Sequence, residues 1–119
     1  MRFLHHPTAP PLLVEVADTE AKRTQGLLGR TELGTNQGML FVFDRPGLYS
    51  FSMRGMQIPL DLIMLYSDGT VVGRMHMAVG ATCLYRGDVP YKYAVEVPWN
   101  WTTKHRIFSG DRFEFGKEL

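Results

Sequence analysis

From residue 38 onward, apolar and polar residues tend to alternate with a period of two, as in residues 91–97, which read YKYAVEV. This pattern places alternate side chains on opposite faces of a β-strand and does not match the three- to four-residue spacing of an amphipathic helix. β-branched and aromatic residues are common in these segments, and turn-forming residues separate them. The second half of the chain is therefore predicted to be mostly β-sheet.

The strongest hairpin signal is the pair Asp68 and Gly69, which lies between the apolar segments 60–66 and 71–77. An Asp-Gly pair suits the tight turn between antiparallel strands because both residues tolerate a positive φ. The apolar run 38–43 is followed by turn formers at 44–47. Further strands are predicted at 12–16, 49–53, 91–97 and 112–115.

One short helix is predicted over residues 18–30. Asp18 is a suitable N-cap because its side chain can accept hydrogen bonds from the free backbone N–H groups of the first turn. Gly26 and Gly29 each lower helix stability by roughly 1 kcal/mol relative to alanine. Their presence indicates a helix end or a close approach to another element.

A chain of 119 residues can bury one hydrophobic core without help from disulfides or metals. We expect a single domain over residues 1–119, with an extended lead-in over 1–11 and the folded core over 12–116. Three prolines in the lead-in lack the N–H that a central strand needs. The predicted fold class is mainly β: a small barrel-like or strongly bent antiparallel sheet with one short α-helix packed against it.

Charge and hydropathy argue against several classes of partner. The formal net charge is +1, so there is no basic surplus to neutralise phosphates, and no nucleic-acid partner is expected. The longest apolar runs, such as 39–43, have five residues, whereas a membrane span needs about 20. The chain as given shows no signal peptide. An exported protein with its leader omitted would read the same, so the localisation stays open.

Seven methionines together with His76 and Cys83 raise the possibility of a copper site, because soft sulfur ligands favour cuprous ion. The spacing argues against it: Met75 and Met77 share one face of a strand, and His76 points to the other. Methionine is also a common core filler. No dinucleotide fingerprint or phosphate-binding glycine loop is present. We expect no metal and no cofactor, and we do not expect an enzyme.

Asp61 interrupts the apolar strand LDLIML. Because a strand with apolar residues on both faces is normally covered on both faces, this carboxylate must take up a proton or find a cation. The candidate arginine partners are Arg23, Arg30 and Arg54. A structural ion pair between helix and sheet and a polar spot in a ligand cleft both fit this pattern. An acid and base pair of Asp61 with Glu96 is left open.

Six short segments carry a resemblance to a known family through their order and spacing. They are 26–30 (GLLGR), 38–43 (GMLFVF), 51–53 (FSM), 58–62 (IPLDL), 94–97 (AVEV) and 109–111 (SGD). Together they resemble the DUF192 family, small domains of unknown function, over about residues 13–115. Ser52 stands where the family commonly has tryptophan, Leu28 where it has methionine, and 98–100 where it has Ala-Gly. The resemblance implies a mainly β, barrel-like domain with one helix and no established activity.

Two hypotheses about function follow. The leading one is a non-enzymatic module that binds an unknown small molecule in a cleft between the helix end and the Asp61 strand. Its candidate wall residues are Arg23, Arg30, Met53 and Asp61. The alternative is a protein-interaction or accessory domain that acts through the aromatic Trp99 and Trp101 region, because exposed aromatic side chains suit protein interfaces. In that case Asp61 is merely structural.

Overall fold

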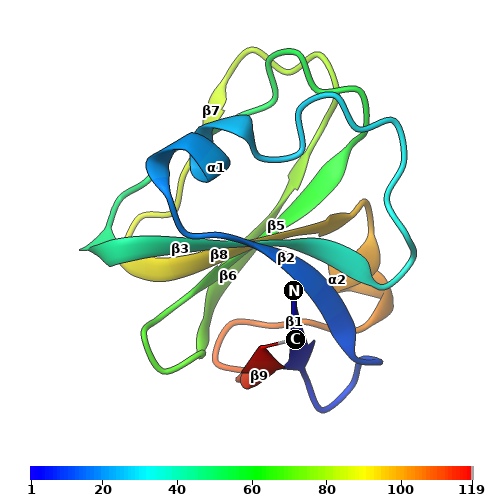
Figure 1. Ribbon diagram of the computed structural model, residues 1–119. Helices are drawn as coiled ribbons and strands as arrows, with labels where there is room; N and C mark the ends of the chain where they lie inside the picture. Colours follow the sequence, from blue (N-terminus) through cyan, green and yellow to red (C-terminus); the bar gives the residue numbers. More distant parts are fainter. Residues whose placement is uncertain (119) are drawn as a thin grey trace.

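The computed structural model describes residues 1–118 (Figure 1). Seven strands form one sheet that curls into a half-barrel. They are β1 (Arg2–His5), β2 (Leu12–Ala17), β3 (Gln37–Gly47), β5 (Leu60–Leu65), β6 (Val71–Met77), β8 (Tyr91–Pro98) and β9 (Glu114–Glu118). The short strands β4 (Phe51–Ser52) and β7 (Leu84–Tyr85) pair with each other, and the helices are α1 (Glu20–Gln25) and α2 (Trp101–Lys104). Among the helices of this described part, none is long and apolar enough to cross a membrane.

The strand order of the large sheet is β6-β5-β8-β3-β2-β1-β9. Neighbouring strands are antiparallel, except that β2 and β3 run parallel. The parallel pair follows from α1, because a helical crossover brings the chain back in its original direction. The prediction of a mainly β, strongly bent sheet with a helix packed against it is confirmed.

The two edges of the sheet meet at one end of the half-barrel. Thr70 and Arg112 form an isolated antiparallel bridge, Val71 N–H donates to the Asp111 carbonyl at 2.7 Å, and Phe113 N–H donates to the Gly69 carbonyl at 2.9 Å. This seam satisfies backbone groups that an open sheet edge would leave unpaired. It also brings the start of β6 against the start of β9, which closes one end of the curl.

Buried apolar side chains form two cores, one on each face of the sheet. The inner core comprises Leu4, Leu12, Val14, Leu40, Ile63, Leu65, Val71, Val95, Val97, Trp101, Ile107 and Phe113. The outer core comprises Ala17, Leu27, Met39, Phe41, Phe43, Phe51, Met53, Met56, Leu60, Leu62, Met64, Met77, Tyr91 and Ala94. Figure 1 shows α1 and β7 on one side of the central strands and β1 and β9 on the other. All six residues of β5 are buried as a consequence.

The helix is shorter than the predicted 18–30. Its N-cap is Thr19, whose Oγ1 accepts from Lys22 N–H at 3.2 Å, and not Asp18. It ends at Gly26, where φ is +48°. A positive φ is readily adopted by glycine and stops the helix. The second glycine, Gly29, lies in the turn that follows.

Other boundaries also differ from the prediction. Residues 2–5, expected in the lead-in, form β1, because the prolines lie in the connection to β2 and leave the preceding residues free to pair. The expected turn at 44–47 is part of β3. The strand expected at 112–115 begins at Glu114, since residues 112 and 113 are used by the seam. The four-residue helix α2 is a feature that the sequence patterns missed.

The seam depends on Gly69, where φ is +88° and a Cβ would lie 2.4 Å from the Phe113 carbonyl oxygen. We predict that Gly69→Ala lowers the free energy of unfolding by about 3 kcal/mol, from backbone strain and the collision together. Gly80→Ala is the control, because φ there is +84° with no other atom within 4 Å of the added Cβ. It should cost about 1 kcal/mol. Equal losses in urea denaturation would show that the seam contact contributes nothing.

Candidate functional site

A cleft of about 360 Å³ opens where the end of α1 faces β3 and β4. Its size is within the roughly 300–1,000 Å³ of small-molecule sites. Phenylalanine rings form its apolar wall, arginines and serines contribute polar groups, and one acid from β8 reaches it. The lining residues used below are Glu20, Arg23, Phe41, Phe43, Phe51, Ser52, Arg54, Met56 and Glu96.

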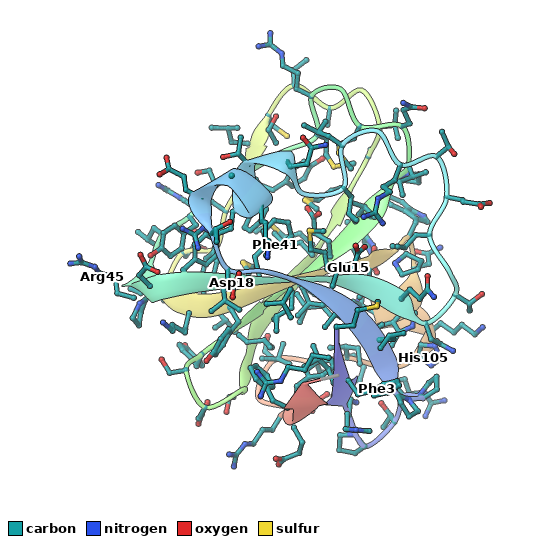
Figure 2. The ribbon with its side chains drawn as sticks, in the orientation of Figure 1. Phe3, Glu15, Asp18, Phe41, Arg45 and His105 are labelled. Carbon is teal, nitrogen blue, oxygen red and sulfur yellow. The ribbon has the colours of Figure 1, made fainter. Side chains whose placement is uncertain are left out.

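The aromatic wall comes from β3 and β4. Phe41 and Phe51 make an edge-to-face contact with ring centres 5.2 Å apart, and Phe43 lies 6.2 Å from Phe51. Figure 2 shows Phe41 between α1 and the sheet. A Cβ on Gly26 would lie 3.4 Å from the Phe41 ring, so the glycine at the helix end also lets the chain pass close to this wall.

Glu96 supplies the buried acid of the cleft. It lies on β8, and its register partners on both neighbouring strands, Met39 and Leu62, belong to the outer core. The residue is 5% exposed, and burial alone raises the pKa of its carboxyl from the usual 4.5 to about 7. Within the described residues no hydrogen bond or ion pair to this carboxyl is found, yet its oxygens are not among the fully buried polar atoms that lack a partner, so they keep some contact with the cleft. A largely buried carboxyl without a protein partner is costly, so this position calls for an explanation beyond packing.

Two arginines lie around the same cleft without pairing to Glu96. Arg23, on α1, donates through Nη1 to the Val42 carbonyl at 2.8 Å, and its guanidinium carbon lies 5.6 Å from the centre of the Phe43 ring. Arg54 is exposed on the loop after β4. The cleft therefore combines positive charge on its walls with a buried acid that lacks a cation.

Asp61 is fully buried, as predicted, but its partners are not arginines. His76 Nδ1 lies 2.6 Å from Oδ1, which also accepts from Asn100 N–H at 3.2 Å. Thr102 donates to Oδ2 through its N–H at 3.0 Å and its hydroxyl at 2.5 Å. The predicted arginine partner was wrong because these donors come from β6 and α2, and α2 had not been foreseen.

Asp61 and Glu96 lie on opposite faces of the sheet. In the register of β5 and β8, Asp61 is opposite Val97, and Leu62 is opposite Glu96. Side chains of adjacent strand positions point to opposite faces. The two acids therefore cannot act as an acid and base pair, and the Asp61 side chain does not line the cleft. Its hydrogen bonds tie α2 to the sheet instead.

The remaining predicted wall residues are dispersed. Arg30 forms an ion pair with Glu15 at 2.7 Å, and this hydrogen-bonded guanidinium holds the pKa of Glu15 below its usual value. Met53 is 1% exposed, packs in the outer core and lines a neighbouring groove of about 570 Å³. Of the four predicted residues, only Arg23 lines the cleft that contains Glu96.

The two tryptophans of the alternative hypothesis have different surroundings. Trp99 is 42% exposed, with its ring centre 5.1 Å from that of His76. Trp101 is 3% exposed and belongs to the inner core, where its Nε1 donates to Asn36 Oδ1 at 3.1 Å. The region therefore presents one indole to solvent and not two.

Sequence reasoning considered Glu96 only as a possible acid–base partner of Asp61, and it missed the three phenylalanines as site residues. One signal was available for Glu96: it is an acid between Val95 and Val97 in a strand with apolar alternation. That pattern predicts a carboxylate near the hydrophobic core, but it does not predict whether a hydrogen-bond donor lies close to it. The phenylalanines read as ordinary core residues, because nothing in the sequence places α1 above them.

Fold and site together define a half-barrel β-domain with an acid-containing cleft beside its helix. The model of the DUF192 family, described as "Uncharacterized ACR", matches residues 4–115. The chain belongs to the DUF192 family.

Two solved structures are similar to this chain. One, from Sinorhizobium meliloti 1021, is provisionally described as a transcription regulator; it is 26% identical, with a TM-score of 0.91, over 96% of this chain and 92% of that one. The other is a protein of unknown function from Novosphingobium aromaticivorans DSM 12444, 27% identical, with a TM-score of 0.87, over 95% of this chain and 82% of that one. No curated protein matches the sequence.

The Asp61 cluster leads to a stability prediction. Asp61→Asn replaces one accepting oxygen with an amide that donates, so at least one buried donor on α2 or His76 loses its acceptor. We expect the free energy of unfolding in urea to fall by about 1–3 kcal/mol. Asp88→Asn, at an exposed loop position, should change it by less than about 0.5 kcal/mol. Equal effects of the two substitutions would contradict a structural role for Asp61.

Glu96 leads to a prediction about pH. A folded-state pKa of about 7 against 4.5 in the unfolded chain means that the unfolded state ionises first as the pH rises. The contribution of Glu96 to the free energy of unfolding is therefore largest below pH 4.5. It falls as the pH rises from 4.5 to about 7 and does not change further above that. Relative to Glu96→Gln, the wild type should lose about 3 kcal/mol across this window. Urea denaturation of both proteins from pH 4.5 to 8 measures the difference; a constant difference would contradict the buried acid.

Proposed function

We propose that this protein is a small-ligand-binding domain and that its site is the cleft between α1, β3 and β4. The observation that carries the proposal is Glu96, a residue only 5% exposed whose carboxyl lines the cleft and forms no ion pair within the described residues. Buried acids in folded proteins normally have a hydrogen-bond partner. A ligand in the cleft would supply the missing one.

The contrast with Asp61 supports this reading. Both acids are buried in the same sheet, but Asp61 accepts hydrogen bonds from His76, Asn100 and Thr102. Glu96 receives no comparable partner from the described part of the chain. A structural role accounts for Asp61 fully. No interaction within the described residues offsets the free-energy cost of burying Glu96, and such uncompensated acids are typical of binding or catalytic sites.

We propose binding rather than catalysis. General acid–base chemistry needs a second titratable group within reach of the same reacting atom. Asp61 faces the opposite side of the sheet, and Arg23 is held by the Val42 carbonyl. The small-molecule proposal is also preferred over nucleic acid, because the net charge of +1 offers little attraction for a phosphate backbone. The description of the Sinorhizobium neighbour is not evidence of DNA binding by this chain.

The alternative, an interaction domain, now depends on Trp99. A single exposed indole is common on protein surfaces and does not form a large apolar patch. Trp101 contributes to the inner core and is not available to a partner. The cleft is therefore the stronger candidate.

The proposal predicts a localised response to ligands. Met56 lines both the cleft and the neighbouring groove, whereas Met53 lines the groove and not the cleft. In a fragment screen observed through ¹³C-labelled methionine methyl groups, binders in the cleft should shift the Met56 signal and leave the Met53 signal unchanged. A screen of several hundred small amines, acids and alcohols without any Met56 response would overturn the proposal.

A blocking variant provides the control for that screen. Ser52 lines the cleft, and Ser52→Trp would place a large ring against its wall. We expect affinity for any binder to fall at least tenfold, about 1.4 kcal/mol. Ser67→Trp, in the exposed turn between β5 and β6, adds the same ring elsewhere and should leave affinity unchanged.

A further inference from the structure

We propose that the ligand of this cleft carries a protonated amine, which binds against the Glu96 carboxylate and the phenylalanine wall. This inference rests on the proposed function and names the chemical class of the ligand. It is supported by the acid, by the aromatic rings that line the same cleft and by the charged residues there.

The first argument is the hydrogen-bonding chemistry of Glu96. An ionised carboxylate only accepts hydrogen bonds, and Glu96 is a residue only 5% exposed, whose carboxyl has no protein donor in the described residues. An ammonium group supplies donors and the opposite charge at once, and their attraction is stronger where water is excluded. A hydroxyl group would leave the charge uncompensated. An anion would be repelled.

The second argument is the aromatic wall. The Phe51 ring lies between two others in contact, with its centre 5.2 Å from that of Phe41 and 6.2 Å from that of Phe43. Faces of aromatic rings attract cations, and the cleft that these rings line also contains the Glu96 carboxyl, so it offers an ammonium group both kinds of attraction. The protein already uses this property, because the Arg23 guanidinium lies 5.6 Å from the centre of the Phe43 ring. The rings also provide surface for an apolar body.

The third argument is the balance of charge. Besides Glu96, the charged residues that line the cleft are Glu20 and Arg23 from α1 and Arg54 from the loop after β4. The neighbours of Glu96 on β3 and β5 are apolar. Arg23 is held by a backbone carbonyl, and within the described residues neither arginine forms an ion pair with Glu96. Glu96 therefore has no paired cation. One small ammonium group would balance its single negative charge, whereas a polycation would bring excess positive charge to a cleft that two arginines already line.

Binding of an amine has a defined proton balance. Near neutral pH the Glu96 carboxyl is partly protonated, because burial raises its pKa to about 7. The ammonium ligand keeps its own protons, and the carboxyl must ionise to pair with it. Each binding event at a protonated Glu96 therefore releases one proton to solvent. Affinity should therefore fall up to tenfold for each pH unit below 7 and level off above it.

The experiment compares three probes with the same apolar body: 2-phenylethylamine, 2-phenylethanol and 3-phenylpropionate. Each is titrated into the full chain at pH 5.5, 7 and 8.5 and followed through the Met56 methyl signal. We expect the amine to bind at least tenfold more tightly than the other two at pH 8.5 and to weaken toward pH 5.5. Equal or tighter binding of the alcohol or the acid at pH 8.5 would overturn the amine inference and leave the proposed function standing.

Variants separate the acid from general effects. Glu96→Gln should abolish both the preference for the amine and its pH dependence, while Glu32→Gln, at an exposed position, should change neither. The Gln variant is expected to be at least as stable as the wild type at pH 8.5, so its loss of amine binding cannot be attributed to unfolding, and its melting temperature checks this. Retention of the amine preference in Glu96→Gln would overturn the inference. If all three probes and the wider screen leave Met56 unchanged, the proposed function fails as well.

Discussion

The burial of β5 and β8 on both faces is the constraint on which the rest of this structure depends. Every residue of β5 is buried, with the inner core on one side and the outer core on the other. Strands of this kind leave little room for a polar side chain, so each acid on them must have a partner or a function. The half-barrel needs both covers: the curl of the sheet with α2 on one face, and α1 with the β4–β7 pair on the other.

Asp61 and Glu96 show two outcomes of that constraint. On the inner face, Asp61 receives the backbone N–H groups at the start of α2 and the imidazole of His76, and so becomes a structural link. On the outer face, Glu96 meets apolar neighbours and a cleft. The same residue chemistry thus gives a tether in one place and an open binding position in the other. The difference lies in what packs above each strand face.

Particular residues show how far prediction could go. The hairpin around Asp68 and Gly69, the strand at 91–97 and the burial of Asp61 all follow from local pattern, since alternation and turn chemistry act over a few residues. The arginine partner of Asp61 was wrong because the real donors come from a four-residue helix with no side-chain cap on its N-cap residue. The lead-in was partly wrong because pairing of β1 with β9 joins residues more than 100 positions apart.

By itself, the sequence determined the mainly β class, the central hairpin, the presence of one helix between the strands near residues 12–16 and 38–43, and the DUF192 resemblance. These depend on side-chain periodicity, on residues that tolerate particular backbone angles, and on the order of short motifs. Only the tertiary structure decided which face of each strand is covered by which element, and therefore that Asp61 is satisfied and Glu96 is not. The physical reason is that hydrogen-bond partners and burial arise from segments distant in the chain, whose approach no local pattern specifies.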